Sequence, residues 1–419
     1  MKTKNLWFTL SLINLCIVAL FGVTLRTKLL FPLRFIDFKN FLSAHSHFAF
    51  GGWVTLVLMV LYIDSILTPQ QQQKKIYQWI FWGIEINSLG MLVTFPFQGY
   101  AFLSILFSTL FIVFTYAFTW VYIKDLRQVQ LPKPVKLLAV VALVSLVVSS
   151  IGPFTLAYIL ATKTGNAILY RDSIYTYLHF QYNGFFTCSV FALLLNQVVK
   201  KIDERLTKTI TQFALLLTLS VIPTLFLSML WHAYNPFIRG VAIVGCALAL
   251  LTLVRFLPVA FNRKLYAVYS SPLARTLLLF SVISFIIKMT LQMGTIVPRL
   301  GNAVFGYRPI IIGFLHLVFL GFVTFYVISH FWSDGVFFNK KRFSKVAVIF
   351  FAAAIIFSEA ILLADGIGLM FYTTNAAYAW LLWVASIFLF TGAILILAAR
   401  LNKVSKNKSH RAMALEVKQ

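Results

Sequence analysis

The amino-acid sequence predicts an all-α, polytopic membrane protein that crosses the bilayer about twelve times. Its 419 residues are 60% hydrophobic and 11% charged, and the mean hydropathy is +0.88. A soluble domain cannot hide so much apolar surface from water, so lipid must solvate most of the chain. The apolar runs are also ~20–25 residues long, the length that crosses a hydrocarbon core. Both observations predict one transmembrane domain over residues 1–400, followed by a basic cytoplasmic tail, 401–419.

The first apolar run, 6–25, is expected to remain as a helix because no small-residue cleavage site follows it. The next runs are joined by short connections rich in helix-breaking residues, such as TPQQQQKK (68–75), LPKP (131–134) and SDG (333–335). No soluble domain interrupts the series. The predicted spans are 6–25, 41–63, 76–95, 102–123, 136–160, 174–199, 209–232, 238–260, 274–297, 309–331, 346–369 and 376–399.

The basic residues lie mainly on one side of the predicted bundle. A formal charge of +25 would suggest nucleic-acid binding in a soluble protein. When the spans alternate from a cytoplasmic N-terminus, however, most Lys and Arg residues fall in the inner loops, as the positive-inside rule requires. The clusters at 200–201 and 340–342 suit anionic inner-leaflet lipids. We therefore expect a bacterial-type inner membrane, cytoplasmic termini, the lipid bilayer as partner and no nucleic acid.

Five histidines from four predicted spans share one depth in the membrane. The direction of each span places His45, His47, His179, His232 and His316 within roughly 10 Å of the outer boundary, at 1.5 Å per helical residue. His330 lies about 21 Å deeper than His316 by the same measure. Each histidine taken alone is typically a hydrogen-bonded packing residue, but an ionisable group inside a span usually has a partner or a function.

Neutral imidazole is a good ligand for haem iron, copper or zinc, and helix bundles build such sites from facing helices. The three cysteines, Cys16, Cys188 and Cys246, are dispersed in apolar runs and indicate no disulfide or thiolate site. A set of nitrogen ligands without thiolate or carboxylate favours haem or copper. His45 and His47 are about 200° apart on a helix, so one inward-facing site cannot easily use both.

At this point the pattern resembles the haem–copper oxidase subunit I superfamily, whose twelve-helix bundle carries metal-ligating histidines on helices 2, 6, 7 and 10. The segments AHSHFAFGGW (44–53) and FLHLVFLGFVTFYVISH (314–330) are also similar to those of NnrS-type haem- and copper-containing membrane proteins of the nitric-oxide response. The resemblance implies a respiratory or nitric-oxide-response protein with haem and, as a second cofactor, copper. It implies oxidoreductase-like chemistry, although it assigns no reaction. It also implies other respiratory membrane subunits as partners and a diatomic gas as ligand.

Carried over residue by residue, the resemblance makes His45 or His47 a haem ligand and His316 its partner, with His179 and His232 at the copper positions. Three departures count against a complete binuclear centre. Val318 stands where oxidases have a second histidine, Trp231 precedes His232 where they have another, and Tyr182 follows His179 by three residues instead of four. One haem or one metal is therefore the economical expectation.

Other polar residues inside the spans offer a different interpretation. Lys288, Glu85 and Glu359 lie mid-span, where a Lys288–Glu359 ion pair would lower the cost of insertion and a proton or ion path is the functional alternative. They also suit a twelve-helix secondary transporter, although matching repeat halves are not evident. A third alternative is a non-catalytic assembly subunit. Arg299 and Arg308 flank the tenth span, where they suit either haem propionates or ordinary loop positions.

Overall fold

The structure, a computed structural model, describes residues 2–199, 202–232, 235–337 and 341–416. Helices make up 87% of the protein, and the described residues contain no strand. In chain order the elements are α1 (Lys2–Leu30), α2 (Phe38–Phe48), η1 (Ala49–Thr55), α3 (Leu56–Ile66), α4 (Pro69–Gln72), α5 (Lys75–Gln98), α6 (Phe102–Leu126), α7 (Lys133–Ser149), α8 (Ile151–Thr162), α9 (Ala167–His179), η2 (Phe180–Phe186), α10 (Thr187–Val198), α11 (Glu204–Leu225), η4 (Phe226–Met229), α12 (Pro236–Ala260), α13 (Arg263–Tyr266), α14 (Pro272–Gly294), α15 (Pro298–Gly306), α16 (Arg308–His316), η5 (Leu317–Thr324), α17 (Phe325–Ser333), α18 (Arg342–Met370) and α19 (Ala377–Glu416).

Eleven helices in the described residues are long and apolar enough to cross a membrane, which confirms a multi-pass membrane protein. The sixth predicted span, 174–199, is not among them. It lies on the continuous helix of α9, η2 and α10, where polar side chains such as Gln181, Asn183 and Asn196 lower the hydropathy. Every residue from His179 to Leu195 is buried. A helix surrounded by other helices need not be apolar, because protein and not lipid is its solvent.

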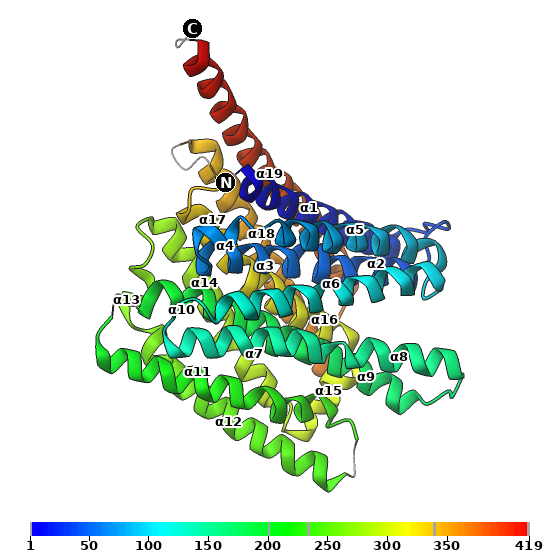
Figure 1. The fold of residues 1–419 in the computed structure, drawn as a ribbon. Coiled ribbons are helices and arrows are strands. Elements are labelled where there is room, and N and C mark those ends of the chain that lie inside the picture. Colours follow the sequence, from blue (N-terminus) through cyan, green and yellow to red (C-terminus); the bar gives the residue numbers. More distant parts are fainter. Residues whose placement is uncertain (1, 200–201, 233–234, 338–340, 417–419) are drawn as a thin grey trace.

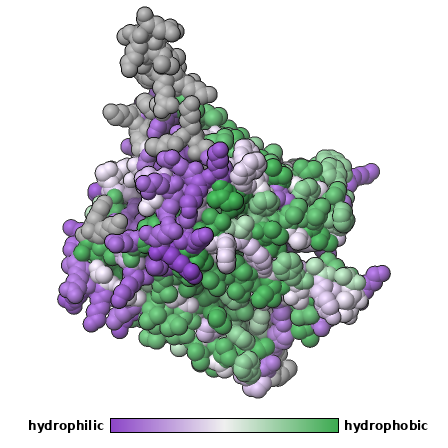
Figure 2. All heavy atoms as spheres, in the orientation of Figure 1, coloured by the Kyte–Doolittle hydropathy of each residue, from purple (hydrophilic) through white to green (hydrophobic). Residues whose placement is uncertain are grey.

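The long helices run side by side along one direction, with the short α4 and α13 at one end of the bundle (Figure 1). The visible face is apolar across its middle and hydrophilic towards the end where α4 and α13 lie (Figure 2). The first and last helices pack against each other. Arg400 of α19 donates to the Oδ1 of Asn5 at 2.7 Å and to the carbonyl of Val336 at 2.8 Å. The start of α1 and the segment that follows α17 are thus tied to α19 on one side of the bundle.

The alternation of loops predicts the outcome of reporter fusions. A reporter fused after residue 70 or 130 is expected to lie in the cytoplasm, and one fused near 168 or 303 is expected to lie outside. The reason is that the spans reverse direction at each connection and the basic loops stay inside. Paired alkaline phosphatase and fluorescent-protein fusions measure this directly. A cytoplasmic signal near 168 would contradict the common depth expected for the histidines.

Three of the helices contain a π-helical segment: η1, η2 and η5. The widened turn of a π-helix leaves carbonyl groups available to side chains. One carbonyl in each segment is used in this way. Asn14 donates to Gly52 at 2.7 Å, Thr187 to Tyr182 at 2.6 Å, and Ser281 to Phe322 at 2.7 Å.

The three π-helical segments also meet in space. Phe50 of η1, Phe186 of η2 and Phe319 of η5 form an aromatic triad whose ring centroids are 4.5–5.7 Å apart. Such separations are typical of favourable edge-to-face and tilted aromatic pairs. In addition, the Trp53 indole of η1 donates to the Thr324 hydroxyl of η5 at 3.4 Å. The unusual helical turns are therefore packed together near the centre of the bundle.

Candidate functional site

A cavity of about 230 Å³ lies among α1, α2, η1, α16, η5, α18 and α19. Most of its wall is apolar and is made of leucine, isoleucine, valine, alanine and phenylalanine side chains. Two members of the aromatic triad, Phe50 and Phe319, contribute to it. Its polar and basic lining residues are Arg26, His45, Ser46, Arg308, His316, Ser358 and Ser386.

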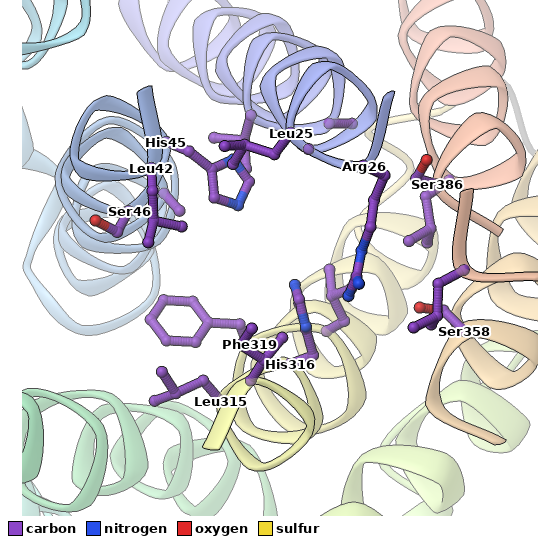
Figure 3. Close-up of a pocket in the computed structure, with 18 of the residues that line it drawn as sticks. Leu25, Arg26, Leu42, His45, Ser46, Leu315, His316, Phe319, Ser358 and Ser386 are labelled. Carbon is purple, nitrogen blue, oxygen red and sulfur yellow. The ribbon is translucent and has the colours of Figure 1, made fainter. Parts of the chain in front are cut away.

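Two of the predicted histidines point into this cavity from different helices. His45 on α2 and His316 at the end of α16 face the open space from opposite sides (Figure 3). The Nδ1 atom of each ring is buried and has no hydrogen-bond partner among the described residues. His45 also packs close to α1, where a Cβ on Gly22 would lie 3.5 Å from the Cε1 atom of the imidazole. The two rings are thus held by packing and are available for a ligand.

His47 points elsewhere, as its angular separation from His45 predicts. Its Nδ1 atom lies 2.8 Å from the carbonyl oxygen of Ser43, and its ring stacks on Phe95 of α5 with centroids 4.5 Å apart. These contacts make His47 a packing residue between α2 and α5. Of the two histidines that the sequence left as alternatives, only His45 lines the cavity.

Two arginines lie at the end of the cavity where α1 ends and α16 begins. Arg26 lines it, and so does Arg308, whose guanidinium also lies 5.1 Å from the ring centroid of Phe38. Arg308 precedes His316 by eight residues, or about 12 Å along the helix. Neither arginine is paired with a carboxylate among the described residues. Arg299 does not line the cavity and is exposed on α15.

His179 is buried, and hydrogen bonds occupy both of its ring nitrogens. Nε2 lies 2.7 Å from the carbonyl oxygen of Val221, to which it donates, and Nδ1 accepts from the Asn183 amide at 3.0 Å. Tyr182 presents its ring edge to this imidazole, with centroids 5.9 Å apart. His179 in this arrangement has no free lone pair for a metal.

His232 is likewise engaged, because its Nε2 atom lies 2.9 Å from Asp172 Oδ2. Its neighbour Trp231 packs against the Arg171 guanidinium, which lies 4.7 Å from the indole centroid. Among the described residues there is no group of three or more His, Cys, Asp or Glu side chains that could hold a metal ion. The geometry offers no support for the copper site that the resemblance implies at His179 and His232.

The three ionisable residues predicted inside the spans do not contact one another, and two of them have a polar partner. Glu85 on α5 accepts from the Asn14 amide at 2.8 Å. The ammonium group of Lys288 on α14 contacts the Asn183 oxygen, and Oε1 of Glu359 on α18 has no partner among the described residues. The predicted Lys288–Glu359 ion pair is therefore wrong, because Lys288 is directed to η2 instead of α18.

The contact of Asn14 with Glu85 leads to a stability prediction. Replacing Asn14 with leucine is expected to destabilise the protein by about 1–3 kcal/mol, because it leaves the Glu85 carboxyl and the Gly52 carbonyl without their donor. Asn87→Leu on α5 is a matched control, since among the described residues the Asn87 amide bonds only to Gly83 of its own helix, at 2.6 Å. Thermal unfolding in detergent measures both. Equal losses for the two variants would contradict a linking role of Asn14.

Arg26, Asn14 and Asn183 were not singled out from the sequence, although Arg26 had a detectable signal. It lies at the outer end of the first span, where the positive-inside rule disfavours arginine. The sequence itself offers no further guide, since it matches neither a protein-family model nor a curated protein. The indications of function are the geometry of the cavity and the motifs around its histidines.

Proposed function

We propose that the protein is an integral membrane haem protein of the respiratory or nitric-oxide-response type, with one haem in the cavity between α2 and α16. The observation that carries the proposal is the pair of imidazoles, His45 and His316, which face one apolar cavity from two helices. Their Nδ1 atoms are without partners among the described residues, and both rings line the cavity, which His47, His179, His232 and His330 do not. This contrast distinguishes ligand candidates from packing histidines.

The residues present fit a haem in three respects. Neutral imidazole is a common ligand of haem iron, and His45 and His316 would supply it. The apolar walls, with Phe50 and Phe319, suit a flat macrocycle. Arg26 and Arg308 lie at one end, form no ion pair with a carboxylate of the described residues and suit the two propionates of a haem. When bound, the haem supplies one-electron redox chemistry or gas binding. The protein's part is to orient the imidazoles, exclude water and neutralise the carboxylates.

The proposal follows the resemblance to haem–copper oxidase subunit I and NnrS-type proteins for the haem, of which it assigns one, but not for the copper. His179 and His232 keep the helix positions of copper ligands, but their hydrogen bonds to Val221 and Asp172 favour structural roles. It also includes a bacterial-type inner membrane with cytoplasmic termini, and other respiratory membrane subunits as partners. A diatomic gas such as nitric oxide is the ligand expected to compete with one imidazole.

Absorption spectra of the purified protein, before and after dithionite, test the proposal together with an iron determination. The expected result is a Soret band that shifts on reduction, with one iron per chain and no stoichiometric copper. Carbon monoxide added to the reduced protein tests the gas ligand by a further Soret shift. A colourless, iron-free protein from a haem-sufficient host would contradict the haem site and favour the transporter, whose candidate residues are Lys288, Glu85 and Glu359.

A further inference from the structure

Lys288 is a buried lysine for which the described residues supply no acidic partner. It is 1% exposed and lies on α14, which crosses the membrane. Its ammonium group contacts the Asn183 oxygen and lies 3.6 Å from the sulfur of Met289. The ring centroid of Phe285 is 5.9 Å away. Every one of these partners is neutral, and no carboxylate of the described residues pairs with Lys288.

The Asn183 contact leaves part of the ammonium group unsatisfied. An ammonium group has three N–H donors, and a thioether sulfur is only a weak acceptor. Asn183 cannot supply a negative charge, and its own amide is directed to His179 at 3.0 Å. A charge taken out of water without a counter-charge is strongly unfavourable. A charged Lys288 therefore requires an anion that the described residues do not supply.

Gln292 provides an independent sign of a missing ligand at the same place. It follows Lys288 by four residues on α14, so the two side chains share a helix face, with Cβ atoms about 5–6 Å apart. Ile287 and Leu291, on the lipid-facing side, are 42% and 43% exposed, whereas Gln292 is 6% exposed. Both polar atoms of its amide, Nε2 and Oε1, lack a hydrogen-bond partner among the described residues.

We propose that Lys288 and Gln292 form a binding site for a small monovalent anion, such as chloride or nitrite, between α14 and η2. The ammonium group supplies the counter-charge, and the Gln292 amide N–H groups donate to the same anion. A water molecule would satisfy the amide but would leave the charge of Lys288 uncompensated. The site is separate from the cavity of His45 and His316, because neither Lys288 nor Gln292 lines that cavity.

The test is the thermal stability of the purified protein in sodium chloride or nitrite against sodium gluconate at constant ionic strength. An anion that binds only the folded state raises the unfolding temperature by mass action. We expect a saturable rise of a few degrees for the natural protein and for the control Lys345→Met, a substitution of the same kind at an exposed position. Lys288→Met is expected to abolish the difference between anions. No difference in the natural protein, or the same difference in Lys288→Met, would overturn the proposal.

Gln292→Leu keeps the test valid if Lys288→Met does not fold. This variant retains the charge and loses the amide donors, so we expect half-saturation at roughly tenfold higher anion concentration. An unchanged half-saturation would overturn the assignment of Gln292. Crystals soaked in bromide give a direct second measurement, with anomalous density expected between the two side chains. The stability measurements need no haem, so a colourless protein that responds to anions would refute the proposed function and leave this site standing.

Discussion

Replacing His316 with alanine is expected to remove the Soret band or to lower haem content at least about tenfold. Loss of partners that merely orient a metal ligand costs about 10–100-fold in metal affinity, and loss of the ligand itself should cost no less. His45→Ala should have an effect of the same size, because the two imidazoles face each other across the cavity. The measurement is the pyridine haemochrome content per chain after identical purification.

His330→Ala and His232→Ala are the controls for this experiment. His330 lies on α17 and interacts with Gln197 and Asp334, and His232 pairs with Asp172. Neither lines the cavity, so both variants should keep the spectrum of the natural protein. Equal loss of haem in all four variants would mean that the spectrum reports folding and not ligation. Unchanged haem in His316→Ala would return His316 to the class of packing residues.

Replacing Gly245 with alanine is expected to destabilise the protein by about 1–3 kcal/mol through overpacking. A Cβ at this position of α12 would lie 2.5 Å from the carbonyl oxygen of Pro223 and 2.9 Å from the backbone nitrogen of Thr224 on α11. Backbone atoms cannot move aside as a flexible side chain can. The two helices can approach this closely only because glycine lacks a side chain, as is common where membrane helices cross.

Gly240→Ala on the same helix is a matched control, because a Cβ there meets no other atom within 4 Å. It should leave stability unchanged or raise it slightly, since alanine favours helix over glycine. Thermal unfolding in detergent, followed by tryptophan fluorescence, compares the two variants. Equal stability of Gly245→Ala and the natural protein would show that α11 and α12 can separate at this point without loss.

The membrane-spanning helices could be predicted because lipid imposes a strong and uniform requirement on the residues that it solvates. The span 174–199 does not meet this requirement, because lipid does not surround it. Other helices of the same protein surround it, so it tolerates residues such as Gln181 and Asn183, and it is not among the eleven helices that are long and apolar enough to cross a membrane. It was predicted as an apolar run like the others.

The candidate site could be predicted only in part. A common depth can be calculated from helical rise, and of the five histidines that it groups, His45 and His316 line the cavity. Depth does not give direction around the helix, so it could not separate His45 and His316 from His179, whose ring is bonded to Val221 and Asn183. Partners from distant segments, such as Asn183 for Lys288, depend on tertiary packing that no local pattern contains.

The π-helical segments explain a further part of this difficulty. An α-helix turns by about 100° per residue, and a π-turn accommodates one residue more than an α-turn. Segments η1, η2 and η5 each follow a histidine within four residues, so each helix changes phase just below its histidine. A single helical period fitted across the whole span therefore assigns the wrong face to one half of it.

The same phase change divides each of these helices into two parts that can be adjusted separately. Deleting one residue within 317–324 would convert the π-turn into a regular α-turn and rotate the half that bears His316 by about 100° against the half that bears His330. The chain could thus redirect an imidazole without moving the inner packing of the same helix. Each π-segment thus sets the angle between an outer part of the helix, which bears the histidine, and an inner part, which packs within the bundle.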